Sequence, residues 1–126
     1  MNLELSKVNL KMIIRNKDEI EVNLFKHLSP TAVGTILRNI PMEGRINKVD
    51  ETFVYMLTPI KIGAERSRKK FEKGDISFIA SNGAIGIFLK DMTVSKSMSL
   101  IGKIEVGIEI FNQISNGESI SLVMDK

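Results

Sequence analysis

GDISFIASNGAIGIFL, residues 74–89, is the stretch that decides the fold of this chain. Two apolar runs flank Asn82-Gly83, the dipeptide most typical of a two-residue hairpin turn, because both residues tolerate a positive φ. With these two residues at the tip, Phe78 pairs with Ile87. Successive strand side chains point to opposite faces, so one face of this hairpin is apolar and belongs to the core.

The other face of the same hairpin is mixed. It carries the large ring of Phe88 close to Gly86, which has no side chain. A ring beside an empty position favours a groove on the outer face, although Phe88 also fits a position packed under a loop or helix. We therefore expect Phe78 to be a core residue and Phe88 to line a groove.

The rest of the chain supplies further strands and two helices. Residues 29–40 predict the clearest helix, because Ser29 is a good N-cap, Pro30 suits the first position and Pro41 disfavours continuation. A shorter helix is predicted at 108–115, with Gly117 as a left-handed cap. Alternating apolar residues predict strands at 8–15, 20–25, 44–49, 52–57, 98–106 and 120–124. Residues 59–73 are predicted to be irregular or partly helical, and 91–97 a polar loop.

These elements predict a mainly β fold, a closed eight-stranded β-barrel with one clear helix at 29–40 and one short helix at 108–115. Closure is expected because it removes the exposed edges of the sheet. A chain of 126 residues is typical of a single domain, here 1–126.

Composition restricts the function classes. The formal charge of +3 favours anionic partners only weakly, and the lack of Cys excludes disulfides and thiolate chemistry. No apolar run is long enough for a signal peptide or a membrane span, so we expect a cytoplasmic protein without membrane contact. Abundant Lys and Ile, without Trp or Cys, suit a thermophile.

Three segments occur in an order that resembles the cyclophilins. SPTAVGTILRNI, residues 29–40, is similar to their helix, the hairpin at 74–89 follows, and LIGKIEVGIEIFNQISNGESI, residues 100–120, is similar to their closing strand, turn and short helix. The resemblance covers most of the chain from Leu24 onward. It is closest to compact cyclophilin-like proteins of archaea and bacteria, and it implies an eight-stranded barrel whose isomerising members bind a prolyl peptide on the outer face.

The resemblance also implies a candidate groove on the outer face, formed by Arg45, Phe53, Met56, Phe88 and Met98. Arg45 stands where the isomerases carry their catalytic Arg, although a solvated strand charge is the other interpretation of it. Met56 and Met98 fall where the isomerases carry Gln and His, and Trp is absent. These residues favour a binding domain for a peptide or a small apolar ligand, without efficient catalysis. A weak peptidyl-prolyl isomerase is the alternative.

Other sites are poorly supported by the residues. The single His, His27, precedes the helix, and with no Cys the sequence predicts no metal site, no catalytic triad and no cofactor. The stretch 61–73 holds six basic residues against two acidic ones. It suits contact with nucleic acid or the ribosome as a further alternative, or a solvated loop.

Overall fold

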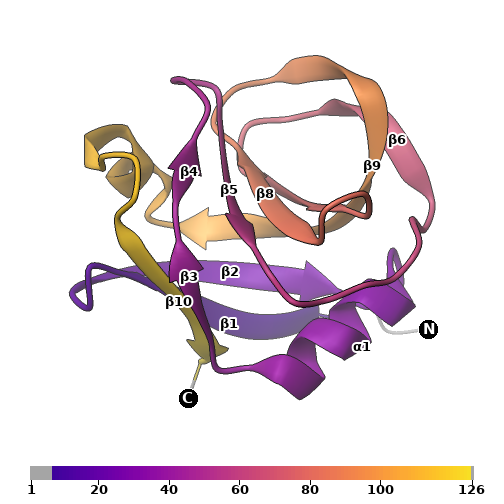
Figure 1. Ribbon diagram of the computed structural model, residues 1–126, viewed down its shortest axis with the longest axis horizontal. Coiled ribbons are helices and arrows are strands. Elements are labelled where there is room, and N and C mark those ends of the chain that lie inside the picture. Colours follow the sequence, from indigo (N-terminus) through magenta and orange to yellow (C-terminus); the bar gives the residue numbers. More distant parts are fainter. Residues whose placement is uncertain (1–6, 126) are drawn as a thin grey trace.

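The computed structural model describes residues 7–125, and these residues form one curved sheet with two helices (Figure 1). The helices are α1 (Pro30–Asn39) and the 3₁₀ helix η2 (Ile108–Gln113). The strands are β1 (Lys7–Ile14), β2 (Asp18–Phe25), β3 (Met42–Arg45), β4 (Asn47–Lys48), β5 (Phe53–Leu57), β6 (Ser67–Phe71), β7 (Asp75–Ile79), β8 (Ala84–Phe88), β9 (Met92–Val106) and β10 (Ser119–Met124). The prediction of a mainly β fold with two helices is confirmed.

The strands follow the order β3-β10-β1-β2-β9-β7-β8-β5-β4, and β6 pairs with β9 beside this path. All the ladders are antiparallel. No ladder among residues 7–125 joins β3 at one end of the path to β4 at the other. A closed, hydrogen-bonded barrel is therefore not confirmed.

The two ends of this path are nevertheless consecutive in the chain. The strand predicted at 44–49 consists of two pieces, β3 and β4, separated by Ile46 alone. β3 pairs with β10, and β4 pairs with β5. The turn into β5 lies where the sequence predicts it, and Thr52 donates from its hydroxyl and its backbone N–H to Asp50. These hydrogen bonds lower the pKa of the Asp50 carboxyl.

The central hairpin has a different register from the predicted one. Phe78 pairs with Ile85, and the four residues Ala80–Gly83 form the connection instead of Asn82 and Gly83 alone. Only Gly83 in this connection has a positive φ, of 71°. The register is shifted by two residues, and because the side-chain period is also two, the core face is the predicted one.

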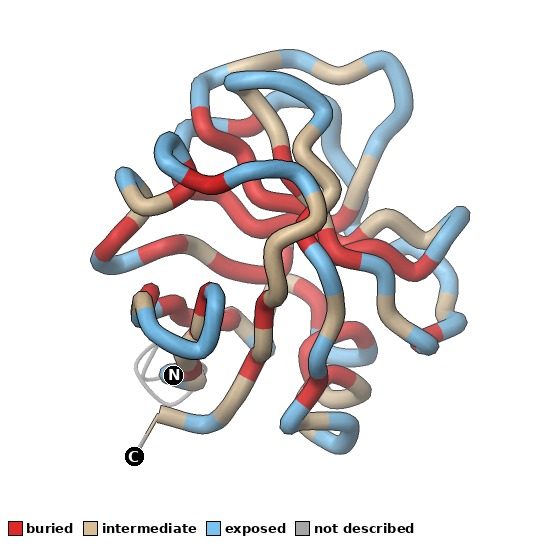
Figure 2. The backbone as a smooth tube through the Cα atoms, turned by 60° about the vertical axis from the view of Figure 1, so that its left-hand side comes forward, coloured by how far each residue is buried: buried red, intermediate tan, exposed pale blue. Residues whose placement is uncertain are grey.

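The core lies between the inner faces of the strands and the two helices. Phe78, Ile85 and Ile87 are buried in it, together with Phe111 of η2. The two helices contact β2, and α1 buries Ala32, Val33 and Ile36. Figure 2 shows the buried backbone gathered in the middle of the molecule, with exposed segments at the periphery.

Three segments differ from the predicted secondary structure. Residues 67–71, expected to be irregular or helical, form β6, and the predicted loop at 91–97 lies mostly inside the 15-residue strand β9. Their mutual pairing explains both errors, since each provides the other's hydrogen bonds. The short helix is 3₁₀ and ends at Gln113, so Gly117, although left-handed with φ of 91°, lies beyond its end.

The N-terminus of α1 is capped by a residue far away in the chain. Ser29 precedes the helix as predicted, but its hydroxyl donates to the carbonyl oxygen of Leu100 at 2.9 Å. The carboxylate of Glu65 instead accepts from the backbone N–H groups of Thr31 at 3.1 Å and Ala32 at 2.8 Å. A carboxylate there satisfies free helix N–H groups and interacts favourably with the helix dipole.

We expect Glu65→Ala to lower the free energy of unfolding by about 1 kcal/mol, the usual cost of losing a helix cap. Urea denaturation followed by circular dichroism measures the change. Glu43→Ala is the matched control, because Glu43 is an exposed glutamate on β3. Equal effects of the two substitutions would contradict a capping role for Glu65.

Candidate functional site

Phe88 lies on the outer face of β8, but it is covered. Its side chain is 0% exposed. The ring stacks on that of Phe71 with centroids 4.3 Å apart and planes at 7°, and it also contacts the ring of Phe53 at 4.8 Å. Phe53 and Phe88, both assigned to the predicted groove, are therefore in contact, whereas β6 covers the open groove expected above them. Of the two positions considered for Phe88, the structure shows the packed one.

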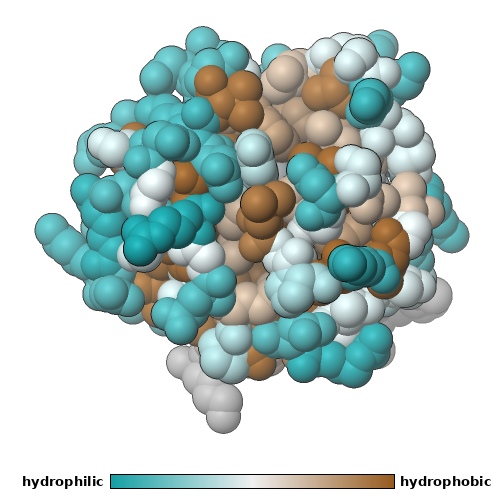
Figure 3. All heavy atoms as spheres, viewed as in Figure 1, coloured by the Kyte–Doolittle hydropathy of each residue, from teal (hydrophilic) through white to brown (hydrophobic). Residues whose placement is uncertain are grey.

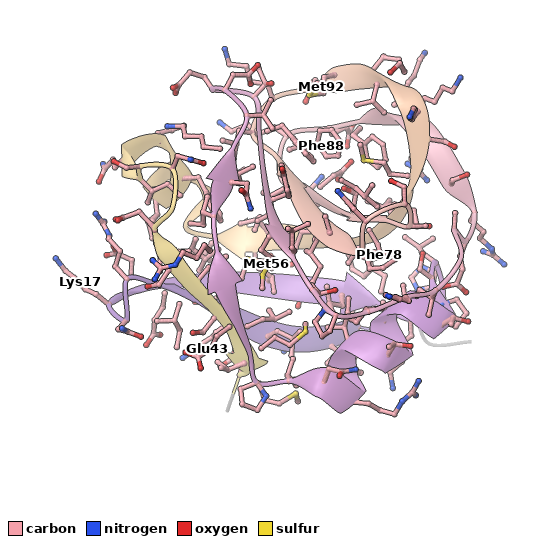
Figure 4. The ribbon with its side chains drawn as sticks, viewed as in Figure 1. Lys17, Glu43, Met56, Phe78, Phe88 and Met92 are labelled. Atoms are coloured by element: carbon pink, nitrogen blue, oxygen red, sulfur yellow. The ribbon has the colours of Figure 1, made fainter. Side chains whose placement is uncertain are left out.

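Met56 does not belong to this outer cluster. It is 2% exposed and lies in the core together with Val54, whereas Phe53 and Tyr55 stack on each other on the other face of β5. Figure 4 shows Met56 and Phe88 well separated in the molecule. Because successive side chains of a strand point to opposite faces, Phe53 and Met56 cannot lie on the same face of β5. This signal is already available in the sequence.

Met98 and Gly86 complete the outer face around Phe53. Met98 is half-buried, and its sulfur lies 3.6 Å from the hydroxyl of Ser77, which donates to it. A Cβ atom on Gly86 would lie 2.4 Å from the ring of Phe53. The ring of Phe53 therefore occupies the space that a side chain at Gly86 would fill. This packing explains why the outer face has a residue without a side chain next to a large ring.

Arg45 is exposed on β3, and its guanidinium donates to the carbonyl oxygen of Gly117 at 3.0 Å. Of the five predicted groove residues, the structure thus brings Phe53 and Phe88 into contact and puts Met98 on the same outer face. Met56 and Arg45 lie elsewhere, Met56 in the core and Arg45 beside the loop that precedes β10.

A pocket of about 720 Å³ lies outside the core, between the end of β2, β6, β9 and the start of β7. Its lining has apolar side chains and charged groups of both signs. The residues are Phe25, Arg68, Lys70, Phe71, Glu72, Asp75, Asp91, Met92, Thr93, Leu100 and Lys103. Phe71 thus separates this pocket from the covered Phe88.

The acidic groups of the pocket are engaged with the protein itself. The buried Asp75 accepts from the backbone N–H of Glu72 at 2.8 Å and forms an ion pair with Lys103 at 3.5 Å. Glu72 also forms an ion pair with Lys103, at 3.6 Å, and Asp91 accepts from the backbone N–H of Lys73 at 2.8 Å. The ion pairs identified among residues 7–125 do not include the cations Arg68 and Lys70.

Sequence analysis missed most of this pocket. Phe25, Met92, Leu100 and Lys103 come from segments that no local pattern connects, and Phe71 lies in the basic stretch 61–73. On the face seen in Figure 3, hydrophobic side chains form separate patches between hydrophilic ones. In the pocket, by contrast, four apolar side chains line one space. The pocket is therefore a stronger candidate for a binding site than these separate patches.

Two further properties concern residues 7–125. No group of three or more His, Asp or Glu side chains there is arranged to hold a metal ion. No helix in this range combines the length and apolar character needed to cross a bilayer.

Comparison with known proteins gives a family and a fold. A family model described as cyclophilin-like matches residues 8–123. A search of curated proteins gave no match. Among solved structures, the solution structure of a hypothetical protein from Archaeoglobus fulgidus is similar, with 21% identity, a TM-score of 0.77, and coverage of 95% of this chain and 96% of that one.

Two other solved structures share the fold at lower identity. A cyclophilin-type peptidyl-prolyl cis-trans isomerase from Cryptosporidium parvum has 15% identity and a TM-score of 0.71, with 95% of this chain and 98% of that chain covered. McbB in complex with tryptophan has 9% identity and a TM-score of 0.78, and the match covers 92% of this chain but only 44% of McbB. These likenesses show the fold alone.

Proposed function

Because this chain belongs to the cyclophilin-like family, we propose that it is a binding domain that takes a peptide or a small apolar ligand on the outer surface of its sheet, without efficient catalysis. The observation that carries this proposal is the pocket of about 720 Å³ outside the core. Its size lies within the roughly 300–1,000 Å³ typical of ligand sites.

The lining of the pocket suits such a ligand. Phe25, Phe71 and Leu100 offer apolar surface, and Met92 adds a flexible side chain that adapts to ligands of varied shape. The charged groups at the same pocket supply hydrogen-bond partners for a peptide backbone or a polar ligand group. Lys103, about half exposed, has donors to offer.

The position of Arg45 argues against efficient proline isomerisation. Isomerisation is assisted by a donor near the prolyl nitrogen, and a guanidinium is suited to this role. Arg45 is not among the residues that line the pocket, and its guanidinium is bonded to Gly117. A ligand in the pocket is therefore expected to bind without rapid turnover.

Titration of the protein with a proline-containing peptide, followed by NMR, tests the binding site. We expect chemical-shift changes at Met92, Leu100 and Lys103, and at least a tenfold weaker binding for Leu100→Ala, since a buried apolar contact is lost. Leu57→Ala is the matched control, because Leu57 is 52% exposed and lies outside the pocket. Shift changes confined to Phe53 and Tyr55, with unchanged affinity for Leu100→Ala, would place the site elsewhere.

A weak peptidyl-prolyl isomerase is the second candidate. It is favoured by the shared fold of the Cryptosporidium parvum enzyme. A protease-coupled isomerisation assay separates the candidates. Activity above background that disappears in Arg45→Ala would support the enzyme, and activity at background level would exclude it. We also propose a cytoplasmic location, because the sequence has no apolar run long enough for a signal peptide or a membrane span. An archaeal or thermophilic source is proposed because Lys and Ile are abundant and Cys and Trp are absent.

A further inference from the structure

Strand β6 has one unpaired edge. It pairs with β9 and, among residues 7–125, with no other strand. In Figure 1 it runs along the right-hand margin of the molecule, outside β9. An unpaired edge presents backbone N–H and C=O groups to which another extended chain can add.

The same edge carries positive charge that no neighbour neutralises. Arg66, Arg68, Lys69 and Lys70 are exposed, and the ion pairs identified among residues 7–125 include none of them. The acidic residues on either side are directed elsewhere. Glu65 caps α1, and Glu72 forms an ion pair with Lys103.

We infer that β6 accepts an extended acidic segment of another protein as an added strand. This inference rests on the proposed function, because it names the class of peptide that the domain binds. Like charges on an edge strand repel a second copy of the same strand. The same charges attract a segment of opposite sign, so charge selects the partner.

The pocket adjoins this edge and defines the partner further. Arg68, Lys70 and Phe71 belong to β6 and also line the pocket. A five-residue strand such as β6 spans about 17 Å at the usual rise of roughly 3.3–3.4 Å per residue. The expected ligand is therefore about five residues of extended chain, with Asp or Glu opposite the cations and one apolar side chain that enters the pocket near Leu100.

Three synthetic peptides of equal length and with the same central Leu test this inference. The first carries Asp and Glu, the second carries Asn and Gln in their place, and the third repeats the first with alternate backbone amides methylated. We expect the acidic peptide to bind about tenfold more tightly than the neutral one at low salt, with a smaller ratio at high salt. Methylation should weaken binding, because strand addition uses main-chain hydrogen bonds.

A pair of charge-reversal variants identifies the surface. Lys69→Glu is expected to remove the preference for the acidic peptide, because Lys69 is exposed on β6 and does not line the pocket. Lys17→Glu is the matched control, since Lys17 is exposed in the turn between β1 and β2, at the far left of Figure 4. Circular dichroism verifies that both variants fold.

The outcomes distinguish this inference from the proposed function. Equal affinity for the acidic and the neutral peptide, with shift changes at Leu100, would overturn strand addition and leave the binding pocket in place. Failure of every peptide to bind would overturn the inference and would exclude these peptides as ligands of the proposed binding domain, leaving a small apolar ligand. Tight binding of a single-stranded oligonucleotide that Lys69→Glu abolishes, without binding of the acidic peptide, would assign β6 to phosphate contacts and overturn the inference.

Discussion

Phe88→Ala is expected to lower the free energy of unfolding by about 3–5 kcal/mol, as much as Phe78→Ala. Both side chains are 0% exposed. Phe78 packs in the core, and Phe88 packs on the outer face of β8 against Phe71 and Phe53. Removing either ring therefore leaves a cavity that the surrounding side chains fill only in part. Urea denaturation of the two variants measures the losses.

Equal losses differ from the expectation from sequence, in which Phe88 lines an open groove and contributes much less than Phe78. Tyr55→Ala provides the reference, because Tyr55 lies on the same outer face and is only half-buried. A loss for Phe88→Ala no larger than that for Tyr55→Ala would show that Phe88 is accessible in solution. The arm formed by β6 and the first half of β9 would then leave Phe88 uncovered, and the groove predicted from sequence would exist.

Gly102→Ala is expected to be the second severe substitution, with a loss of roughly 3 kcal/mol, at the upper end of the usual range for overpacking. Gly102 of β9 pairs with Leu24 of β2 on one side and with Ile76 of β7 on the other. A Cβ atom on Gly102 would lie 2.2 Å from the carbonyl oxygen of Asn23 and 3.0 Å from the Cα atom of Leu24. These are backbone atoms of a paired strand, so the added methyl group forces β2 and β9 apart.

Gly63→Ala is the control for Gly102→Ala. A Cβ atom on Gly63 would have no atom within 4 Å, and its φ is not in the left-handed region. We expect Gly63→Ala to leave stability unchanged or to raise it slightly, because alanine restricts the unfolded chain. Differential scanning calorimetry of both variants measures the effects. Similar melting temperatures would show that the β2–β9 pairing adjusts to the methyl group.

The parts of the fold that sequence predicted correctly depend on local chemistry. The helix beginning at Pro30 and ending before Pro41 follows from the geometry of proline. The core face of the central hairpin follows from alternation, which a register shift of two residues leaves unchanged. The register depends on the length of the connection between β7 and β8. The Asn82-Gly83 dipeptide alone does not specify whether Asn82 lies in a two-residue turn or in the four-residue loop that is observed.

The arm formed by β6 and the first half of β9 was predicted wrongly, and only its β6 strand lacks a local pattern. Its strands are largely exposed and polar, and only Phe71 in β6 is fully buried. β6 therefore shows no apolar alternation, whereas in β9 the apolar residues Met92, Val94 and Met98 do alternate with polar ones, interrupted only by Lys96. The two strands are stabilised by hydrogen bonds to each other across the register shift at Arg68–Lys70. Because this arm covers Phe88, the error in secondary structure became an error in the candidate site.

The candidate pocket could not be predicted from the sequence, because its lining residues come from separate segments. Its apolar wall combines Phe25 at the end of β2, Phe71 in β6 and Leu100 in β9, and the curvature of β9 brings these residues together. The inclusion of Met56 was an avoidable error, because strand alternation separates it from Phe53. The predicted groove included both Phe53 and Phe88, and their contact follows from the pairing of β5 with β8.

The place of β10 in the sheet has a consequence for synthesis of the chain. β10 lies between β1 and β3, yet it follows both in the sequence. While the chain emerges from the ribosome, the edges of β1 and β3 stay unpaired until residues 119–124 become available. Nascent chains with two open edges are prone to pair with one another. β10 therefore completes the sheet and also covers the two edges of β1 and β3 that are open in the growing chain.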